Sequence, residues 1–570
     1  DDSANSNNWS HHNMTNAAGV GNDSLEDTPT NNFPTLSAIN RSTNNTFGEA
    51  NLLAKGGDNY AAATFLLPKT GKWYAEFSKF GNGAAQAVAI TRAHQNTAYN
   101  GHLGLADMVQ YVSNGELGNR TRGDSSDATA WTDDADALIG VAVDMDNGAV
   151  YFAHDNTWQN SGNPTSGASK TGAIATDLLT DNNGEHLFSV QGYNGNTSYG
   201  MYANFGQRDF TYTPPTGYEK LCTANLPEPT ILKPTDHFNT VLYTGNGAVK
   251  TVTGAGFQPD LLINKRRDSA NVNLVVDSVA GTAYGRSTAL TDEEWTSNLT
   301  LNSDGFVTAD WNGSAINHNG GTYVSHFWKG GGAASSNGTG SITSSVSANA
   351  TAGFSIVGYT GSNNTSETIG HGLGVKPDMI IVKNRDEAGQ NWPVYHKDLD
   401  GGTAPHTHQI RLNLDNAEND VNDVWNDTAP TSSVFTVGNE GEVNKNTIKY
   451  IAYCFSEVAG YSKIGSFIGN GSADGQRIHT EFKPAWLMMK RANDTGGWVI
   501  INNKSGPTNE IDEYLYAHLS NPEFSGEALR WDFLSNGFKM RTTNAWGNAS
   551  GSTYLYIAFA ETPFKYANAR

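Results

Sequence analysis

The sequence has few cysteines, few basic residues and no long apolar run. Cys222 and Cys454 are its only cysteines in 570 residues. They fall in different predicted domains, so a disulfide framework is not expected. No run approaches the ~18 apolar residues of a membrane span. The chain has 36 basic and 57 acidic residues, a net charge of −21, and it shows no basic stripe typical of nucleic-acid binders. We therefore expect neither nucleic acid nor a membrane as a partner.

Motifs of common catalytic machinery are also missing. The sequence has no Gly-x-Ser-x-Gly nucleophile elbow and no Walker-type phosphate loop. Helical periodicity is scarce, and residues 510–518 are the best helix candidate. Hydrophobic residues make up 37% of the chain, against the usual ~45–50%, while 13 Trp, 23 Tyr and 23 Phe can fill small cores. This mixture predicts all-β modules with polar turns and not a disordered chain.

Three stretches of the sequence repeat one another. Each opens with an aromatic-x-Gly turn, at Tyr243, Tyr359 and Phe467. Each then has an apolar run that starts at a Pro and ends in Lys, and each closes with an Asn-rich turn and a strand, Asn317 to Phe327, Asn444 to Phe455 and Asn548 to Phe559. The runs end at Lys265, Lys383 and Lys490, with spacings of 383 − 265 = 118 and 490 − 383 = 107. A period near 110 suits a small domain and is too long for a solenoid repeat.

The apolar runs of the repeats have a structural interpretation. A Pro at the first residue of a strand costs no ladder hydrogen bond, so we interpret the runs that follow Pro259 and Pro377 as buried strands. We expect their terminal lysines to snorkel at the rim of each sheet. Because no catalytic residue recurs in the three copies, the repetition favours a chain that spans distance or presents surface over an enzyme.

The sequence divides into six predicted segments. They are an extended N-terminal arm (1–30), a β-sandwich (31–220), a first β module (221–329), a Gly/Ser-rich linker (330–352), a second module (353–460) and a third module (461–570). The chain starts without Met and without a signal-peptide pattern. We therefore expect it to be a processed or partly ordered piece of a longer product.

The 31–220 segment resembles a known family on three motifs in order. They are Thr70-Gly-Lys-Trp-Tyr-Ala-Glu76, the hairpin Ile139-Gly-Val-Ala-Val-Asp-Met-Asp-Asn-Gly148, and Asn204-Phe-Gly-Gln-Arg-Asp-Phe210 followed by Pro214-Pro-Thr-Gly-Tyr218. These are similar to the signatures of SPRY (B30.2-type) domains. The resemblance implies a bent antiparallel sandwich that binds partners through loops at one edge and catalyses nothing. One departure concerns those loops: His154-Asp-Asn156 stands where the family has Lys-Asn-Gly.

The remaining 350 or so residues resemble repeat modules that follow SPRY-like domains in structural proteins of marine tailed phages. The similar phrases are Tyr359-Thr-Gly361, His371-Gly-Leu-Gly-Val-Lys-Pro-Asp378, Gly469-Asn-Gly-Ser-Ala-Asp-Gly475 and Pro563-Phe-Lys-Tyr-Ala-Asn-Ala-Arg570. The resemblance implies a virion structural protein at the particle surface. Its partners would be copies of itself, other virion proteins and a host glycan or protein.

The metal-site candidates are few. Asp144 and Asp146, at i and i+2 on a strand, could face the same way and bind a hard cation such as Ca²⁺, with Asp133, Asp134 and Asp136 just upstream. The alternative is turn chemistry, in which these side chains bond their own backbone. His406 and His408 could place two imidazoles on one strand face, but surface histidines in a polar loop explain them as well.

These observations lead to one expectation for the whole chain. We expect an all-β, multi-domain protein with a SPRY-like, concanavalin-type sandwich followed by three related jelly-roll-like β-sandwich modules. We expect no enzyme activity and no cofactor, and a tail fibre or similar appendage that binds a host surface as a homo-oligomer, with a trimer implied by the fibre resemblance. A capsid decoration protein and a polysaccharide depolymerase remain as alternatives.

Overall fold

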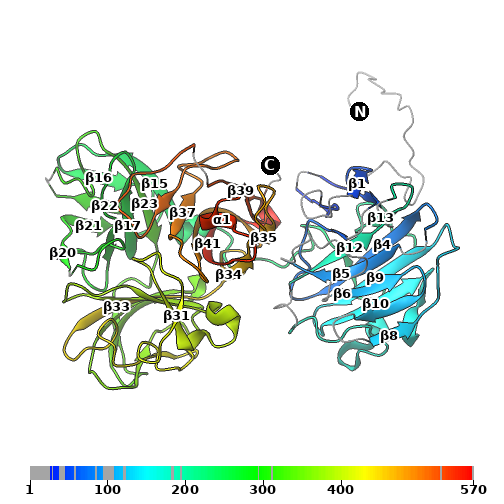
Figure 1. The fold of residues 1–570 in the computed structure, drawn as a ribbon, viewed down its shortest axis with the longest axis horizontal. Helices are drawn as coiled ribbons and strands as arrows, with labels where there is room; N and C mark the ends of the chain where they lie inside the picture. The colour runs from blue at the N-terminus through cyan, green and yellow to red at the C-terminus, as the bar shows by residue number, and fades with distance from the viewer. Residues whose placement is uncertain are drawn as a thin grey trace. The chain divides into compact units, whose positions relative to one another are not determined.

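The chain forms two compact units, residues 1–227 and 228–570, in a computed structural model (Figure 1). The structure describes residues 26–28, 30–37, 45–56, 60–83, 86–93, 108–119, 124–180, 185–192, 196–292, 294–309, 312–526 and 529–567. Nearly all of its regular elements are strands, so the prediction of an all-β, multi-domain chain is confirmed. Most of the predicted N-terminal arm (1–30) lies outside the described residues.

The first unit is a pair of β-sheets, with neighbouring strands antiparallel except where β14 (Glu219–Lys220) joins β4. One sheet has the order β1 (Asn45–Gly48), β2 (Leu53–Gly56), β13 (Gly200–Asn204), β4 (Lys72–Phe80), β9 (Leu138–Asp144), β10 (Ala149–His154) and β11 (Thr157–Trp158). The other has the order β3 (Ala61–Ala62), β12 (His186–Gln191), β5 (Ala87–Arg92), β6 (Met108–Val112), β7 (Glu116–Asn119) and β8 (Asp124–Asp127).

The three motifs of the SPRY resemblance contact one another in this unit. Asp146, in the β9–β10 turn, accepts a hydrogen bond from the Gly71 N–H (2.7 Å) at the start of β4. The buried Glu76 carboxylate, on β4, accepts from the N–H groups of Thr211 (2.8 Å) and Tyr212 (2.9 Å), which lie between the two parts of the third motif. Motifs far apart in sequence thus fix one another's backbone.

The boundary between the units lies a few residues later than predicted. Residues 221–227 belong to the first unit and not to the first β module. Leu221 and Cys222 are buried, and the Thr223 N–H donates to the Asn32 carbonyl (2.9 Å). The two cysteines of the chain are both free and buried.

The second unit contains three copies of one two-sheet arrangement. Copy 1 has a main sheet, β15 (Phe238–Thr244), β23 (Thr322–Trp328), β17 (Leu261–Arg266) and β18 (Leu274–Asp277), and a small sheet, β16 (Lys250–Thr253), β22 (Gly305–Thr308) and β21 (Leu299–Asn302). A short hairpin, β19 (Tyr284–Gly285) and β20 (Trp295–Thr296), belongs to the same copy.

Copies 2 and 3 repeat this order, and Figure 1 shows them from yellow-green to red. Copy 2 has β24 (Ser335–Asn337), β25 (Ser344–Asn349), β26 (Phe354–Thr360), β33 (Lys449–Phe455), β28 (Met379–Asn384), β29 (Pro393–His396), β30 (His408–Arg411) and β31 (Asn419–Asp420), with a small sheet of β27 (Glu367–Gly370) and β32 (Val434–Val437). Copy 3 has β34 (Ser462–Ile468), β41 (Thr553–Pro563), β36 (Phe482–Arg491), β37 (Val499–Asn502) and β38 (Leu515–Tyr516), with a small sheet of β35 (Arg477–His479), β40 (Gly537–Met540) and β39 (Trp531–Leu534).

The Gly/Ser-rich stretch 330–352 is not a linker. It carries β24 and β25, and β25 pairs with β26 from Ser345 to Asn349. The Asp260 carboxylate holds its start by accepting from the N–H groups of Gly330 (2.8 Å) and Gly332 (3.2 Å). Small residues there allow close backbone approach, which composition alone cannot separate from flexibility.

Helical structure is limited to segments of three to six residues in the part of the chain that the structure describes. The α-helix is α1 (Ala545–Asn548), and the 3₁₀ turns are η1 (Gln159–Ser161), η2 (Pro164–Ser169), η4 (Pro234–Asp236), η5 (Ala350–Ala352), η6 (Leu399–Gly402), η7 (Pro405–Thr407) and η8 (Phe564–Tyr566). None of them has the length and apolar character needed to cross a bilayer. The predicted helix at 510–518 is wrong, because Tyr514 and Tyr516 bury their rings in the core of copy 3. The segment is extended there: Ile511 and Tyr514 form isolated β-bridges, and Leu515–Tyr516 is strand β38, which pairs with β37.

We call β17, β28 and β36, the strands that carry the apolar runs ending in Lys, the central strands of the three copies. Each central strand is buried on both faces. Along β17, Leu261 and Ile263 face one core while Leu262 faces another, as expected when side chains alternate across a strand. β28 and β36 alternate in the same way. One face packs against the copy's own small sheet, and the other enters an apolar core that all three copies build together. We call this the shared core.

Residues common to the three copies fix each copy internally. The aromatic residue of each opening turn stacks on a tyrosine of the closing strand, with ring centroids 5.0 Å apart for Tyr243–Tyr323, 5.1 Å for Tyr359–Tyr450 and 5.1 Å for Phe467–Tyr554. The first asparagine of each closing segment, Asn317, Asn444 or Asn548, is fully buried. Its side-chain oxygen accepts from the backbone of the opening turn, at Asn246, Ser362 or Asn470.

Replacing one of these asparagines should destabilise the second unit. Asn548→Ala leaves the Asn470 N–H and the carbonyls of Ser472 and Thr542 without their present partner. We expect the free energy of unfolding, measured by urea denaturation, to fall by about 3 kcal/mol. Asn419→Ala, at an exposed position of β31, should change it by less than about 0.5 kcal/mol. Equal effects of the two variants would contradict the role of Asn548.

Candidate functional site

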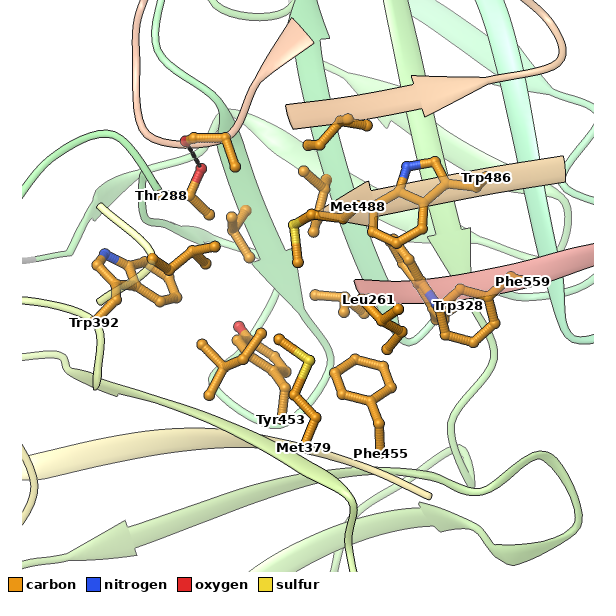
Figure 2. A pocket seen from close by; sticks show the side chains of 17 residues that line it. Leu261, Thr288, Trp328, Met379, Trp392, Tyr453, Phe455, Trp486, Met488 and Phe559 are labelled. Carbon is orange, nitrogen blue, oxygen red and sulfur yellow. Dashed lines mark hydrogen bonds between the residues drawn. The ribbon is translucent and has the colours of Figure 1, made fainter. Parts of the chain in front are cut away.

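A small cavity of the second unit lies in the shared core (Figure 2). All three copies line it, among others through Leu261, Met379 and Trp486, which are equivalent residues. Its volume is about 40 Å³ and its exposed wall is apolar. The Thr288 hydroxyl, which also lines it, donates to the Ala517 carbonyl (2.6 Å). Sites for small ligands usually measure about 300–1,000 Å³ and carry a few unpaired polar groups. The cavity is therefore a gap in the packing and not a binding pocket.

Aromatic rings from all three copies meet around this cavity. Phe559 of copy 3 lies 5.7 Å from Trp328 of copy 1 and 6.1 Å from Phe455 of copy 2, measured between ring centroids. Phe455 and Phe559 end two of the closing segments noted in the sequence, and Trp328 directly follows the third, which ends at Phe327. Trp328 and Trp486 also pack edge to face at 5.5 Å. The copies therefore surround one centre.

One ring of hydrogen bonds joins the copies from side chain to backbone. The donors are the equivalent residues Asn273, Trp392 and Trp498, each placed before or at the start of the strand that pairs with the central strand. Each donates to a carbonyl of another copy: Asn273 to Ala517, Trp392 to Leu290 (3.2 Å) and Trp498 to Arg411 (2.8 Å). Copy 1 bonds to copy 3, copy 2 to copy 1 and copy 3 to copy 2. The ring is closed.

A second ring runs through the backbone. In each copy a glutamate N–H donates to the residue that follows the central strand of the next copy. These bonds are Glu294 to Arg385 (3.0 Å), Glu418 to Ala492 (2.8 Å) and Glu523 to Arg267 (2.9 Å). Salt bridges reinforce two of the three contacts, Arg385 with Glu294 (2.6 Å) and Arg267 with Glu523 (2.6 Å). Copy 3 has Ala492 at that position and cannot form the third.

The repeat lysines are buried and do not snorkel. Lys265, Lys383 and Lys490 are at most 2% exposed, and their ammonium groups donate to backbone carbonyls. Lys490 donates to Asp415 (2.9 Å) and Asn416 (2.8 Å) of copy 2 as well as to Gly496, and Lys265 donates to Leu519 (3.0 Å) of copy 3. The rim prediction is wrong because the neighbouring copy covers the end of each central strand, which one copy considered alone cannot show.

A buried ion cluster adds to the contact between copies 1 and 2. Arg286 is fully buried and forms ion pairs with Asp277 and Glu294. Its guanidinium also donates to the Tyr453 hydroxyl (3.1 Å) of copy 2. Because both carboxylates are paired with arginine, this cluster offers no free acid or base.

The predicted metal candidates Asp144 and Asp146 do not form a site together. Asp144 is fully buried, pairs with Lys72 (3.1 Å) and accepts from the backbone N–H of Asn147 (3.1 Å). Asp146 bonds to Gly71, as described above. Their contacts are those of the turn interpretation, since both side chains hold the β9–β10 hairpin.

Among the described residues, the predicted pair His406 and His408 is not part of a group that could hold a metal ion either. His406 lies in η7 and His408 at the start of β30, where Thr407 contacts its Nδ1 (2.8 Å). Within the described ranges, one group of three side chains has the composition and spacing to hold a metal ion: Asp134, His154 and Asp155. In the sequence, Asp134 belongs to an acidic stretch, and His154 and Asp155 belong to the departure from the SPRY pattern. Chain position did not reveal that they meet.

Removing a buried lysine should cost more stability than removing an exposed one. Lys490→Met leaves three carbonyls without a donor in the protein interior, so we expect the free energy of unfolding to fall by about 3 kcal/mol or more. Lys445→Met, which removes a half-exposed pair with Glu387, should cost less than about 1 kcal/mol. Urea denaturation of both variants tests this. A loss for Lys490→Met no larger than that for Lys445→Met would contradict it.

The same lysines predict how stability depends on pH. Burial lowers the pKa of Lys265 to about 7 and those of Lys383 and Lys490 to about 8, from 10.5. Between these values the unfolded chain binds more protons than the folded chain, so the free energy of unfolding should rise as the pH increases from about 7 to 10. Denaturation across this window should show a smaller rise for Lys265→Met. A falling slope in the wild type would contradict the prediction.

Solved structures similar to this chain include two SPRY domains. The SPRY domain of human HERC1 is 13% identical, and the match covers 31% of this chain and 96% of that chain with a TM-score of 0.22. The TRIM65 PSpry domain is 9% identical, and the match covers 30% of this chain and 88% of that chain with a TM-score of 0.23. Both are domains of the type that the three sequence motifs resemble.

Comparison with curated proteins gives no match. One family model matches residues 233–563, more than half of the chain, and its range runs through all three copies of the second unit. The chain therefore belongs to the family described as a domain of unknown function, DUF7483.

Proposed function

We propose that this chain is a non-enzymatic structural protein on the surface of a tailed-phage particle, in a tail fibre or comparable appendage. In this role it attaches to a host surface by multivalent binding to a glycan or protein. The phage assignment rests on the repeat phrases around Tyr359, His371 and Gly469. The structural role rests on how the copies use the residues that they share.

One observation supports the structural role: the residues that the three copies have in common make contacts inside the protein. The stacked aromatic pairs, the buried asparagines and the buried lysines all bond within a copy or to the next copy. An enzyme repeated three times would keep its reacting groups in common and directed toward a substrate. What these copies have in common is a set of internal contacts that hold the fold together.

Four of the buried carboxylates also favour binding over catalysis. Glu76, Asp144, Asp260 and Asp277 are each engaged by a backbone N–H group, a lysine or an arginine. A glycosidase needs two carboxyl groups roughly 5–9.5 Å apart with open space between them. Carboxylates already satisfied by cations and amides are poorly suited to that chemistry.

Multivalent attachment follows from oligomerisation in this proposal. Single contacts of polar loops with a glycan are weak, and linking several of them raises the overall affinity without new contacts. The acidic surface, from a net charge of −21, keeps such an assembly soluble.

The test combines location, assembly and activity. Antibodies against the full chain should label the tails of purified marine tailed-phage particles in electron microscopy, and light scattering should show a homo-oligomer. Labelled chain should bind cells of a susceptible host without sustained release of reducing ends from their extracted polysaccharide, because the buried carboxylates are occupied.

Three results would count against this function in different ways. Labelling of the capsid shell would make the chain a decoration protein. Sustained release of reducing ends would make it a depolymerase. A monodisperse monomer that binds no host cells would remove the basis for multivalent attachment altogether.

A further inference from the structure

Three side chains of types that bind metals lie close together in two loops of the first unit. His154 is the last residue of β10, Asp155 follows it in the turn to β11, and Asp134 lies in the 131–137 loop before β9. The His154 Nε2 atom is 3.2 Å from an Asp134 carboxylate oxygen and 3.4 Å from an Asp155 oxygen. All three ligand atoms lie within 4.8 Å of one another.

Backbone N–H groups orient the Asp134 and Asp155 carboxylates toward His154. Asp155 uses its Oδ1 atom to accept from the Leu138 N–H (3.0 Å), and its Oδ2 atom is the one that faces His154. Asp134 uses its Oδ1 atom to accept from the Asp136 N–H (3.1 Å), and again its Oδ2 atom faces His154. Such outer contacts orient the ligands of metal sites before the ion arrives. Two carboxylates oriented in the same way toward one imidazole nitrogen form a prepared set of donors.

The spacing of the donors fits a tetrahedral ion. With bonds of about 2.0–2.1 Å to nitrogen and 2.0–2.2 Å to oxygen, two ligands of a tetrahedral Zn²⁺ ion stand about 3.4 Å apart. The two distances to His154 Nε2 are close to this value. Without a cation, a proton on His154 Nε2 can bond well to only one of the two carboxylate oxygens at a time.

We propose that Asp134, His154 and Asp155 bind a divalent transition-metal ion, with Zn²⁺ as the best fit. One imidazole and two carboxylates carry two negative charges when the histidine is neutral, which suits a dication. The imidazole favours Zn²⁺ over Ca²⁺, which takes oxygen ligands. Three protein ligands leave a fourth position for water or for an oxygen of a bound partner. His154, 13% exposed, is the deepest of the three, and Asp134 and Asp155 are about 40% exposed, so that position is open to solvent.

Two of the three proposed ligands, His154 and Asp155, belong to the His154-Asp-Asn156 stretch that departs from the SPRY pattern. A metal there would join the 131–137 loop to the β10–β11 turn at an edge of the sandwich. Zn²⁺ binding by these residues does not depend on whether the chain is a phage protein. Failure of one idea would therefore leave the other standing.

Calorimetric titration of the chelator-treated full chain with Zn²⁺ tests the site. We expect about one equivalent to bind, and at least a tenfold weaker affinity in His154→Ala and in the isosteric Asp134→Asn, because each loses a ligand. Asp136→Asn removes the same charge from the same loop without removing a ligand, so its affinity should equal that of the wild type. With Co²⁺ as the probe, the wild type should show the visible absorption bands of a four-coordinate ion, and His154→Ala should lose them.

Several outcomes would overturn the proposal. They are no Zn²⁺ binding by the wild type, equal affinity in Asp134→Asn and the wild type, or loss of binding in a His406→Ala/His408→Ala double variant instead. Urea denaturation of each variant without metal checks that it is folded. Should His154→Ala fail that check, Asp134→Asn decides alone, since it keeps the size and the Oδ1 contact of the native side chain.

Discussion

The shared core is the contact on which the rest of the second unit depends. Each main sheet presents apolar side chains on both faces, because residues such as Leu261 and Leu262 alternate between two cores. A single copy could cover only one of these faces with its own small sheet. The other face would stay in water, at a cost of about 25 cal/mol per Å² of apolar surface. The copies are therefore stable together, around Trp328, Phe455 and Phe559, and not as three independent domains.

Hydrogen bonds give this core an order that apolar contact cannot. Dispersion and hydrophobic burial are not directional, so they would be favourable for either order of the three copies around the centre. The bonds from Asn273, Trp392 and Trp498 each need one particular carbonyl on one particular neighbour. A wrong order would bury unpaired polar groups at about 1–3 kcal/mol each. The closed ring also removes the exposed ends that linear repeat arrays must cap.

Patterns local to one strand or one turn could be predicted from the sequence, while contacts between copies could not. The buried runs after Pro259 and Pro377 and the Asp144–Gly148 turn depend on neighbours in the chain, and the structure has them. The period near 110 could be read from the sequence because the same local patterns recur in each copy. The fate of Lys490 depends on carbonyls of residues 415 and 416 in another copy, so a single copy suggested a solvated rim. Residues 330–352 looked like a linker because Gly and Ser serve close packing as well as flexibility. The Asp134–His154–Asp155 group comes from two loops that only the fold brings together.

The ring also limits what the three copies can do as binding units. Flexibly linked modules gain affinity because each can reach a separate partner site. Copies locked through a common core cannot move independently, so they act as one rigid body. The copies have also diverged where they meet: Arg267 and Arg385 form salt bridges with the neighbouring copy, whereas the equivalent Ala492 cannot. Such differences fit each copy to its own neighbours. In the proposed function, multivalency would therefore come from the association of several chains, and not from independent movement of the copies inside one.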